Sequence, residues 1–565
     1  MSTLNFLINR STLPLLACLL IWFALLGYRD LVDPDEGRYA EISREMVASG
    51  NWITPRLNGF KYFEKPPLQY WTTATIFTVF GENNTTARLW VAAIGFAGAL
   101  WAGFVGTRLY GRNAGYYAFI ITLSGLLYFG NAHYLTLDTT LTVFVVLALG
   151  SLVLAQHQRR QPATNRAWML LGWAALAAAV LSKGLIGLVL PIGATVFYSL
   201  WQRDWNLWRH LHLIKGATLF LLLTVPWFIA VSTRNDEFAH FFFVREHLQR
   251  YTTPVHGHNG PIWYFPVVFL LATAPWLTTS IMSLVKPSFG WRPRPRSGEF
   301  NAERLLWVFV VFVLFFFSFS NSKLPPYILP ALPIVAILAG RRIAATRSCL
   351  GDPWVLLGLG SILAAMGTVI PLSDNLQQYQ PYRPWLLAAG VSMLVGSAAL
   401  FAGKTRLKTA MTTAGLCSML TFQFLLWGYQ SIVYLRTAKP IANKILALDL
   451  SAQTPVYLVG THAPSLPFYL RRLVTQVAYR GELAMGIDAE PYKNISLPSV
   501  FAQQWQEDKQ AVAVLSNRDF EYFRQFGTPM TVLFQGPRKT LVEKPQNAAQ
   551  NAIGKVDTRQ KTARQ

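Results

Sequence analysis

Long apolar segments separated by short charged loops run through most of this 565-residue sequence and constrain its fold more than any other feature. A helix needs roughly 20 mainly apolar residues to cross a bilayer. The sequence is 52% hydrophobic and only 14% charged, beyond the balance of a soluble enzyme. It therefore predicts a polytopic α-helical membrane protein with about thirteen spans. The predicted spans are 13–28, 89–105, 115–129, 135–154, 168–181, 185–200, 217–231, 262–284, 305–319, 327–339, 355–370, 385–401 and 410–434.

Two apolar segments need separate treatment. The first, residues 13–28, follows Arg10 and lacks a small-residue cleavage site, so we expect an uncleaved signal anchor. Residues 67–80 are too few and too rich in Thr, Gln and aromatic side chains for a comfortable span. This segment is predicted to lie at the membrane interface.

Lysine and arginine residues gather in alternate loops between the predicted spans. Short cytoplasmic loops retain positive charge, so these loops and the N-terminus are assigned to the cytoplasm. The opposite short loops hold little more than Lys183, Lys323 and Arg383. This distribution accounts for most of the net charge of +23. It also argues against nucleic-acid binding, which needs basic residues on one stripe or patch.

Three regions are predicted on the outer side, and loops on a rigid scaffold commonly carry function. Residues 1–435 form the predicted transmembrane catalytic domain, with outer loops at 29–88 and 233–261. Residues 436–545 are expected to form a soluble α/β domain, and 546–565 a disordered tail. In the α/β domain, short apolar strands are predicted at 455–460, 511–515 and 531–534, and helices at 440–448 and 519–526. The three cysteines, Cys18, Cys349 and Cys417, fall in spans or cytoplasmic loops, so the outer domain has no disulfide.

The first outer loop opens with the acidic motif Asp-Pro-Asp-Glu-Gly-Arg-Tyr at residues 33–39. One interpretation is a helix N-terminus, in which Asp33 caps a turn that Pro34 starts and Asp35 and Glu36 favour the positive end of the helix dipole. Capping accounts for Asp33 but leaves the carboxylate of Asp35 free to face a substrate. An acid there could act as a general base or hold a cationic group of a donor.

Glu64 and Lys65 lie side by side just before the interfacial segment, within Tyr-Phe-Glu-Lys-Pro-Pro-Leu at 62–68. They could form an exposed ion pair worth at most about 1 kcal/mol. Alternatively, Lys65 binds an anionic head group at the bilayer surface, with Tyr62 beside it. Asp138 lies about one turn inside a predicted span, and an intramembrane acid is a functional candidate because its insertion is costly.

The second outer loop contains Glu246-His247-Leu248-Gln249-Arg250. In a helix, Glu246 and Arg250 share a face and could form a purely structural pair. A functional alternative gives Arg250 to a phosphate, which suits its fork of donors, and His247 to a metal or a proton. His256 and His258 compete for the metal.

The order of these motifs resembles the lipid-to-lipid aminoarabinose transferases of Gram-negative bacteria. These enzymes belong to the protein O-mannosyltransferase-like superfamily, which has the type C glycosyltransferase fold. The resemblance spans nearly the whole chain and includes Lys-Leu-Pro-Pro-Tyr at 323–327. It implies that 4-amino-4-deoxy-L-arabinose is moved from undecaprenyl phosphate to a lipid A phosphate at the periplasmic face of the inner membrane, without a nucleotide. Such decoration confers resistance to polymyxin and other cationic peptides.

The resemblance also implies roles for individual residues. Asp35 takes the place of the catalytic acid, supported by Asp138. The residues implied in substrate binding are Lys65, Arg250, Tyr62 and Tyr327, which handle the donor phosphate, together with Arg38 and Tyr39 of the acidic motif. Glu64 and His247 fall where a divalent metal, with zinc favoured, would bind.

Two other functions compete with this interpretation. Another polyprenyl-phosphate-sugar transferase, such as a protein O-mannosyltransferase, shares the acidic motif after the first helix. A flippase or transporter for lipid-linked sugars would place charges near the bilayer midplane on broken helices, often within an inverted repeat. Here the notable charges cluster at one membrane face and no repeat is visible, which favours an enzyme.

Overall fold

The structure is a computed structural model that describes residues 13–249, 260–289, 300–349, 351–370, 374–403 and 405–545. For residues 247–249, 374 and 375 it describes the backbone alone. The chain divides into two compact units. The first, the helical unit, comprises Met1–Arg29 and Phe63–Ile432, and the second, the α/β unit, comprises Asp30–Tyr62 and Val433–Gln565.

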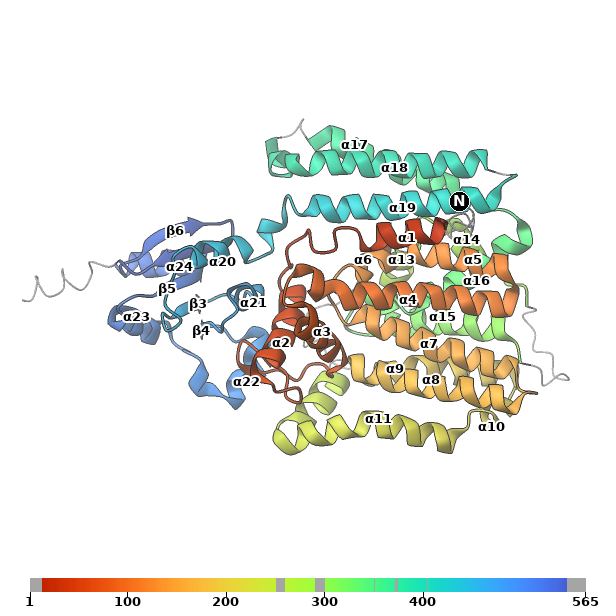
Figure 1. Cartoon of the computed structure of the whole chain (residues 1–565), viewed down its shortest axis with the longest axis horizontal. Helices are drawn as coiled ribbons and strands as arrows, with labels where there is room; N and C mark the ends of the chain where they lie inside the picture. Colours follow the sequence, from red (N-terminus) through yellow and green to blue (C-terminus); the bar gives the residue numbers. More distant parts are fainter. Residues whose placement is uncertain are drawn as a thin grey trace, which may run out of the picture. The chain divides into compact units, whose positions relative to one another are not determined.

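The helical unit is a bundle whose long helices run side by side (Figure 1). Its α-helices are α1 (Leu13–Phe23), α3 (Leu68–Phe80), α4 (Asn84–Tyr110), α5 (Arg112–Leu123), α6 (Leu126–Ala132), α7 (Asp138–His157), α8 (Pro162–Lys183), α9 (Ile186–Gln202), α10 (Asn206–Arg209), α11 (Leu213–Arg234), α13 (Tyr264–Ala272), α14 (Leu277–Val285), α15 (Ala302–Ser318), α16 (Ala331–Thr346), α17 (Asp352–Val369), α18 (Arg383–Ala402) and α19 (Leu407–Tyr429). A π-helix η1 (His240–Gln249) and 3₁₀ helices η2 (Pro325–Ile328) and η4 (Asp374–Tyr382) complete the description.

Each predicted span coincides with one helix or with a pair of them. Among the described residues, six helices are long and apolar enough to cross a membrane, namely α4, α7, α11, α17, the stretch Leu376–Ala402 that contains α18, and α19. The helical architecture is therefore confirmed, while the number of about thirteen spans stays a prediction. The predicted interfacial segment forms α3, whose 13 residues are short for a span.

Two predicted spans are each broken in the middle, and the two breaks face each other. Residues 115–129 break between α5 and α6, and residues 262–284 break between α13 and α14, where Pro275 cannot donate a helical hydrogen bond. The backbone N–H of Leu126 donates to the carbonyl of Ala274 at 2.8 Å, and the indole of Trp276 donates to Ser124 Oγ at 2.8 Å. Each break thus satisfies polar groups of the other, as a membrane interior requires.

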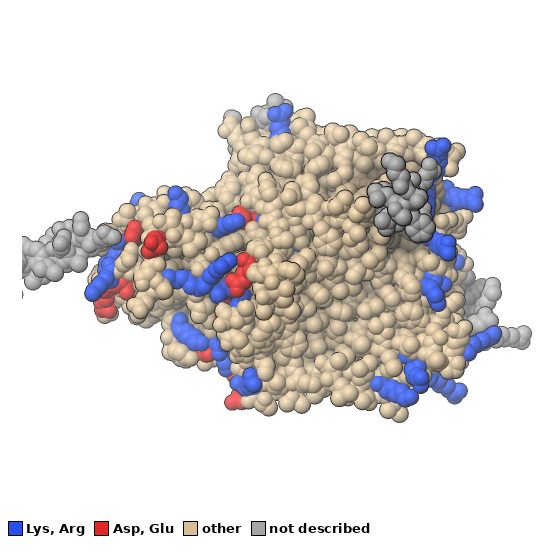
Figure 2. All heavy atoms as spheres, viewed as in Figure 1, with Lys and Arg blue, Asp and Glu red and all other residues tan. Residues whose placement is uncertain are grey.

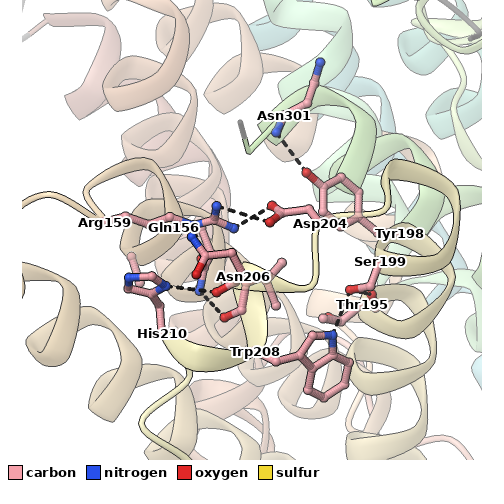
Figure 3. A network of polar contacts seen from close by, with 12 residues as sticks. Gln156, Arg159, Thr195, Tyr198, Ser199, Asp204, Asn206, Trp208, His210 and Asn301 are labelled. Atoms are coloured by element: carbon pink, nitrogen blue, oxygen red, sulfur yellow. Dashed lines mark hydrogen bonds and ion pairs between the residues drawn. The ribbon is translucent and has the colours of Figure 1, made fainter. Parts of the chain in front are cut away.

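A buried polar network joins the C-terminal ends of α7 and α9. It lies at the opposite end of α7 from Asp138. Arg159 pairs with the buried Asp204 at 2.6 Å and donates to Gln156 at 2.6 Å, as Figure 3 shows. The same view shows Tyr198 Oη accepting from the Asn301 backbone, which ties α9 to the start of α15. In Figure 2 one end of the helical unit carries Lys and Arg without visible Asp or Glu. Asp204, after the end of α9, is neutralised by Arg159 inside the protein.

The α/β unit is built around a sheet of five strands in its described residues, in the order β4-β3-β5-β7-β6. Its strands are β3 (Val456–Val459), β4 (Thr475–Val477), β5 (Val512–Ser516), β6 (Thr531–Gln535) and β7 (Lys539–Glu543). Strands β4, β3 and β5 are parallel, whereas β7 is antiparallel to β5 and β6. The five predicted elements are confirmed as β3, β5, β6, α20 (Lys439–Leu446) and α24 (Asn517–Gln525). The sequence patterns missed β4 and β7.

The remaining elements of the α/β unit precede the sheet in sequence or lie between its strands. They are α2 (Asp35–Ser49), a hairpin of β1 (Arg56–Leu57) and β2 (Phe60–Lys61), η5 (Val433–Leu435), α21 (Ser465–Leu470), η6 (Gly481–Leu483), α22 (Ala484–Ala489), η7 (Pro491–Lys493) and α23 (Pro498–Glu507). Residues 30–62 were predicted as part of an outer loop of the transmembrane domain. They instead form one compact unit with residues after Ile432, because contacts such as that of Arg56 with Glu490 at 2.8 Å hold them there.

Candidate active site

A cavity of about 570 Å³ in the helical unit combines apolar walls with several charged side chains. The apolar walls come from α7, from the start of α9, from η1 and from α15, and include Leu141, Ile186, Val189, Phe243 and Phe317. The polar lining residues are Glu64, Lys65, Asp138, Lys183, Glu246, Ser320, Ser322 and Tyr327. Pockets that fix a ligand usually join a large apolar surface to a few placed polar groups. This cavity suits an amphiphile with an apolar chain and a charged head group.

Lys65 lies between two carboxylates that line the cavity. Its ammonium donates to Glu246 Oε2 at 3.0 Å and to the backbone carbonyl of Glu64 at 2.8 Å, while the Glu64 carboxylate is 4.0 Å away. The Lys65 side chain is only 13% exposed, so the alternative of an exposed Glu64–Lys65 ion pair is wrong. Glu246 is buried and belongs to η1. π-Helical turns are rare and frequent at functional sites.

Asp138 and Lys183 form an ion pair at the same cavity. Asp138 is the first residue of α7 and Lys183 the last residue of α8. Each charge therefore has the sign that its helix dipole favours. The Lys183 ammonium also lies 5.2 Å from the centre of the Tyr327 ring, and Tyr327 Oη is 3.3 Å from Ser322 Oγ. The predicted residues Asp138, Lys65, Glu64 and Tyr327 thus line one cavity.

The acidic motif lies in the α/β unit, where it begins α2. The Asp35 side chain is 41% exposed and lies 3.5 Å from Nη1 of Arg38, whose guanidinium is 5.6 Å from the centre of the Tyr39 ring. The interpretation of Asp33 as a helix cap is wrong, since its carboxylate accepts two hydrogen bonds from Ser465, both at 2.8 Å. The N-cap position of α2 is Pro34 and has no side-chain cap, while the Glu36 carboxylate accepts from the backbone N–H of Val32, before the helix, at 3.0 Å.

The other predicted site residues divide between the α/β unit and the undescribed part of the chain. Tyr62 is a buried residue of the α/β unit whose backbone N–H donates to the carbonyl of Pro55 at 2.9 Å. Arg250 lies outside the described residues, as do His256 and His258, and so does the side chain of His247.

Sequence reasoning assigned no role to Lys183 and paired Glu246 with Arg250 alone. For Lys183 a signal existed, because it is one of few basic residues in the loops that lack positive charge. The partner of Glu246, Lys65, lies 181 residues earlier in the chain and carries no local pattern.

Comparisons with known proteins agree with this architecture. Residues 11–242 match the family described as dolichyl-phosphate-mannose-protein mannosyltransferase, and residues 441–544 match the aminoarabinose transferase C-terminal domain. The crystal structure of ArnT from Cupriavidus metallidurans bound to undecaprenyl phosphate is 33% identical and superposes with a TM-score of 0.86. The match covers 95% of this chain and 98% of that one.

Curated relatives extend the likeness. The undecaprenyl phosphate-α-4-amino-4-deoxy-L-arabinose arabinosyl transferase of Aeromonas salmonicida is 32% identical over 77% of this chain and 80% of its own length. The protein of the same name from Pectobacterium carotovorum is 32% identical over 81% of this chain and 80% of its own.

Fold and matches together define a multi-pass membrane glycosyltransferase that depends on a polyprenyl-phosphate-linked sugar. The mannosyltransferase match covers most of the N-terminal part of the chain, including residues 30–62 of the α/β unit, and the C-terminal match is to the aminoarabinose transferase C-terminal domain. The chain belongs to the family of undecaprenyl phosphate-α-4-amino-4-deoxy-L-arabinose arabinosyl transferases.

Proposed function

We propose that this protein transfers 4-amino-4-deoxy-L-arabinose from undecaprenyl phosphate to a phosphate of lipid A, and thereby confers resistance to polymyxin and other cationic peptides. The observation that carries the proposal is the cavity of about 570 Å³, whose lining combines apolar walls with two ammonium groups and three carboxylates. An isoprenoid chain matches the walls and a phosphate head group matches Lys65 and Lys183. The ArnT of Cupriavidus metallidurans, crystallised with undecaprenyl phosphate, supports the same donor lipid.

The reaction exchanges one glycosyl–phosphate bond for another. An oxygen of the acceptor phosphate attacks C1 of the sugar, and the bond between C1 and the donor phosphate oxygen breaks. The electron pair leaves with undecaprenyl phosphate, which becomes a phosphate monoester with additional negative charge. Cations placed at the leaving oxygens lower the barrier by stabilising that charge. Lys65 and Lys183 are proposed for this role, and the predicted role of Arg250 is the same.

The carboxylates have complementary proposed roles. An acceptor phosphate is already ionised at neutral pH, so Asp35 is proposed to position a substrate group and not to remove a proton. Asp138 holds the ammonium of Lys183 by their ion pair. Tyr327 lies beside Lys183 in the cavity and is proposed to contact the donor head group, and Tyr62, Arg38 and Tyr39 keep their predicted roles in substrate binding.

The proposed location is the bacterial inner membrane, with the α/β unit in the periplasm. The proposal is supported by the end of the helical unit that carries Lys and Arg without visible acids (Figure 2), because positive charge is retained on the cytoplasmic side. Asp138 and the buried Arg159–Asp204 pair lie at opposite ends of α7. We therefore propose that the cavity that contains Asp138 lies at the periplasmic face, where both lipid substrates can enter from the bilayer.

A divalent metal at Glu64 and His247, with zinc favoured, remains a separate proposal. Glu64 lines the cavity. Among the described side chains, no three His, Cys, Asp or Glu residues lie close enough to hold a metal ion. The described residues alone therefore do not fit a zinc site, and no step above depends on one. The zinc content of purified protein and of a Glu64→Gln variant would test this proposal.

Transfer between purified components tests the proposed function. The purified protein is incubated with undecaprenyl-phosphate aminoarabinose or with polyprenyl-phosphate mannose, and each donor is offered lipid A or a Ser/Thr-containing peptide. We expect a mass increase of lipid A with the aminoarabinose donor alone. Mannosylation of the peptide would replace the proposal with the mannosyltransferase alternative.

A further inference from the structure

A second cavity, of about 350 Å³, lies wholly within the α/β unit. Asp33 and Pro34 of the acidic motif line it together with residues that follow some 400 positions later in the chain. These later residues come from the stretches 434–441, 461–462, 479–482 and 534–539. The volume is near the lower end of the range for ligand pockets, so the cavity suits one sugar ring with a charged substituent.

The two carboxylates of the lining are already engaged by other groups. Asp33 accepts hydrogen bonds from the backbone N–H and the hydroxyl of Ser465, each at 2.8 Å. Burial raises the pKa of Asp33, although Lys539 and the bonds from Ser465 oppose that rise. Glu482 Oε1 lies 2.6 Å from Nη2 of Arg38. The negative charges of this cavity are therefore largely balanced inside the protein.

The positive charges of the lining are not balanced in the same way. The guanidinium groups of Arg436 and Arg538 have no hydrogen bond or ion pair with any residue that the structure describes. The ammonium of Lys539 donates to a backbone carbonyl, that of His462, at 3.2 Å. Burial lowers the pKa of Lys539 and Arg538 lowers it further, against the charge of Asp33. An anion between these cations would relieve their mutual repulsion.

The backbones that carry the two arginines are held in place by hydrogen bonds. The carbonyl of Arg436 accepts from the N–H of Asp33 at 2.7 Å, which joins this residue to the acidic motif. Arg538 lies in the turn between β6 and β7, and its carbonyl accepts from the N–H of Asn517 at 3.2 Å. The side chain of Asn517 also donates to the carbonyl of Gly536, at 3.1 Å. Such preorganisation reduces the entropy cost of binding a ligand.

The remaining lining combines aromatic rings with polar groups. Tyr434 and Phe534 are partly exposed. The ring of His462 stacks on Tyr479 with centroids 5.1 Å apart, and its Nε2 is 3.6 Å from Glu482 Oε2, beyond hydrogen-bond length. Aromatic surface with a few placed polar groups suits a sugar ring. A guanidinium presents a planar fork of donors that matches the oxygens of a phosphate.

We propose that this cavity binds a phosphorylated sugar of the acceptor lipid, with Arg436 and Arg538 at the phosphate. The inference rests on the proposed function, in which lipid A accepts the transferred sugar. The phosphate of the donor is proposed to lie at Lys65 and Lys183 in the helical unit, so the acceptor is the substrate whose phosphate still needs a site. Because the acidic motif contributes to the lining, a sugar bound here lies beside that motif.

Transfer kinetics with lipid A as the varied substrate test the inference in full-length protein. At saturating donor, Arg436→Gln and Arg538→Gln should each raise KM for lipid A about tenfold, the order expected for one charge-assisted hydrogen bond. We expect little change in kcat or in KM for the donor. Arg518→Gln is the matched control, since Arg518 is an exposed arginine of α24 outside the lining. An Arg436→Gln/Arg538→Gln double variant with the KM of this control would overturn the inference.

Binding measured without the donor identifies the group that the cavity holds. Wild-type protein should bind lipid A more tightly than phosphatase-treated lipid A, and the double variant should lose most of this preference. Inorganic phosphate should compete with lipid A only at far higher concentration, because it lacks the sugar. A preference that the double variant keeps in full would place the phosphate elsewhere. Inorganic phosphate that binds as tightly as lipid A would assign the cavity to a free anion, and either result would overturn the inference.

The outcomes separate this inference from the proposed function. If wild-type protein transfers no aminoarabinose to lipid A, the proposed function is wrong and the inference falls with it. If transfer occurs and the double variant matches Arg518→Gln, the function stands and the inference is wrong. Thermal unfolding in detergent shows whether each variant is folded. Replacing both arginines by lysine keeps the charges and should recover part of the affinity for lipid A, which a loss of folded protein would not allow.

Discussion

Lys183 and Asp138 form an ion pair that joins the last residue of α8 to the first residue of α7 at the edge of the amphipathic cavity. Both side chains are less than one fifth exposed, at 18% and 14%. Removing one partner of a buried pair leaves the other charge uncompensated, which costs more than the pair itself contributes. The pair is therefore expected to act as one unit in both stability and transfer.

Lys183→Gln and Asp138→Asn are each expected to lower transfer by at least about tenfold, and the double variant should lose no more than the worse single variant. Residues that act as a unit give such non-additive losses. Initial rates of lipid A modification measure the effect, with the exposed Arg108→Gln in the same unit as control. A double variant whose loss of rate equals the product of the two single losses would contradict a shared role.

Lys65 is expected to matter through its charge at the donor phosphate. Lys65→Gln should lower kcat about 100-fold, the usual effect of removing one group that stabilises developing negative charge. Lys65→Arg should recover part of the rate, because the charge returns with different geometry. Glu246→Gln keeps Lys65 but removes its 3.0 Å partner, so its rate should fall less. Equal losses in Lys65→Gln and Glu246→Gln would point to a structural ion pair.

Asp35→Asn is expected to give a folded, membrane-inserted protein without detectable transfer. The Asp35 side chain is 41% exposed at the first turn of α2, so an amide of the same shape disturbs little packing. Polymyxin resistance and lipid A mass in a strain that lacks its own enzyme measure the result. Glu36→Gln is not a suitable control because the buried Glu36 carboxylate accepts a hydrogen bond from the backbone N–H of Val32. Full lipid A modification by Asp35→Asn would remove the acid from the mechanism.

The membrane architecture was predictable because its signal is local. A membrane span can be recognised within a window of about 20 residues. Each predicted span has a helix or a pair of helices in the structure. The breaks at Gly125 and Pro275 were not predicted. They are stabilised by each other, and a partner 152 residues away gives no signal in a hydropathy window.

The candidate site was predictable in its residue types and less so in its pairings. Asp138 and Lys65 stood out because charges are rare near spans. Their partners are set by tertiary structure: Lys183 follows 45 residues after Asp138, and Glu246 lies 181 residues after Lys65. Asp33 was interpreted as a cap from its neighbours in sequence, whereas Ser465, far along the chain, is its actual partner.

The pKa of Glu482 is lowered because the effects of His462 and Arg38 outweigh that of burial. This shift predicts how the stability of the folded protein responds to acid. In the unfolded chain this carboxyl titrates near its ordinary value of 4.5, and in the folded protein it titrates lower. Its contribution to stability is therefore complete above about pH 4.5 and is lost as the pH falls through the folded pKa. The Glu482→Gln variant has no carboxyl at this position to titrate. The difference in unfolding temperature between wild type and Glu482→Gln should be constant near neutral pH and shrink below about pH 4.5.

Glu490→Gln provides the comparison, because the pKa of Glu490 is lowered as well, by Arg56 and Lys493 against the effect of burial. The difference in unfolding temperature between wild type and Glu490→Gln should shrink over the same acidic range. We therefore expect matching stability profiles from the two variants. A Glu482→Gln difference that grows on acidification would mean that Glu482 is not held as an anion by Arg38 and His462.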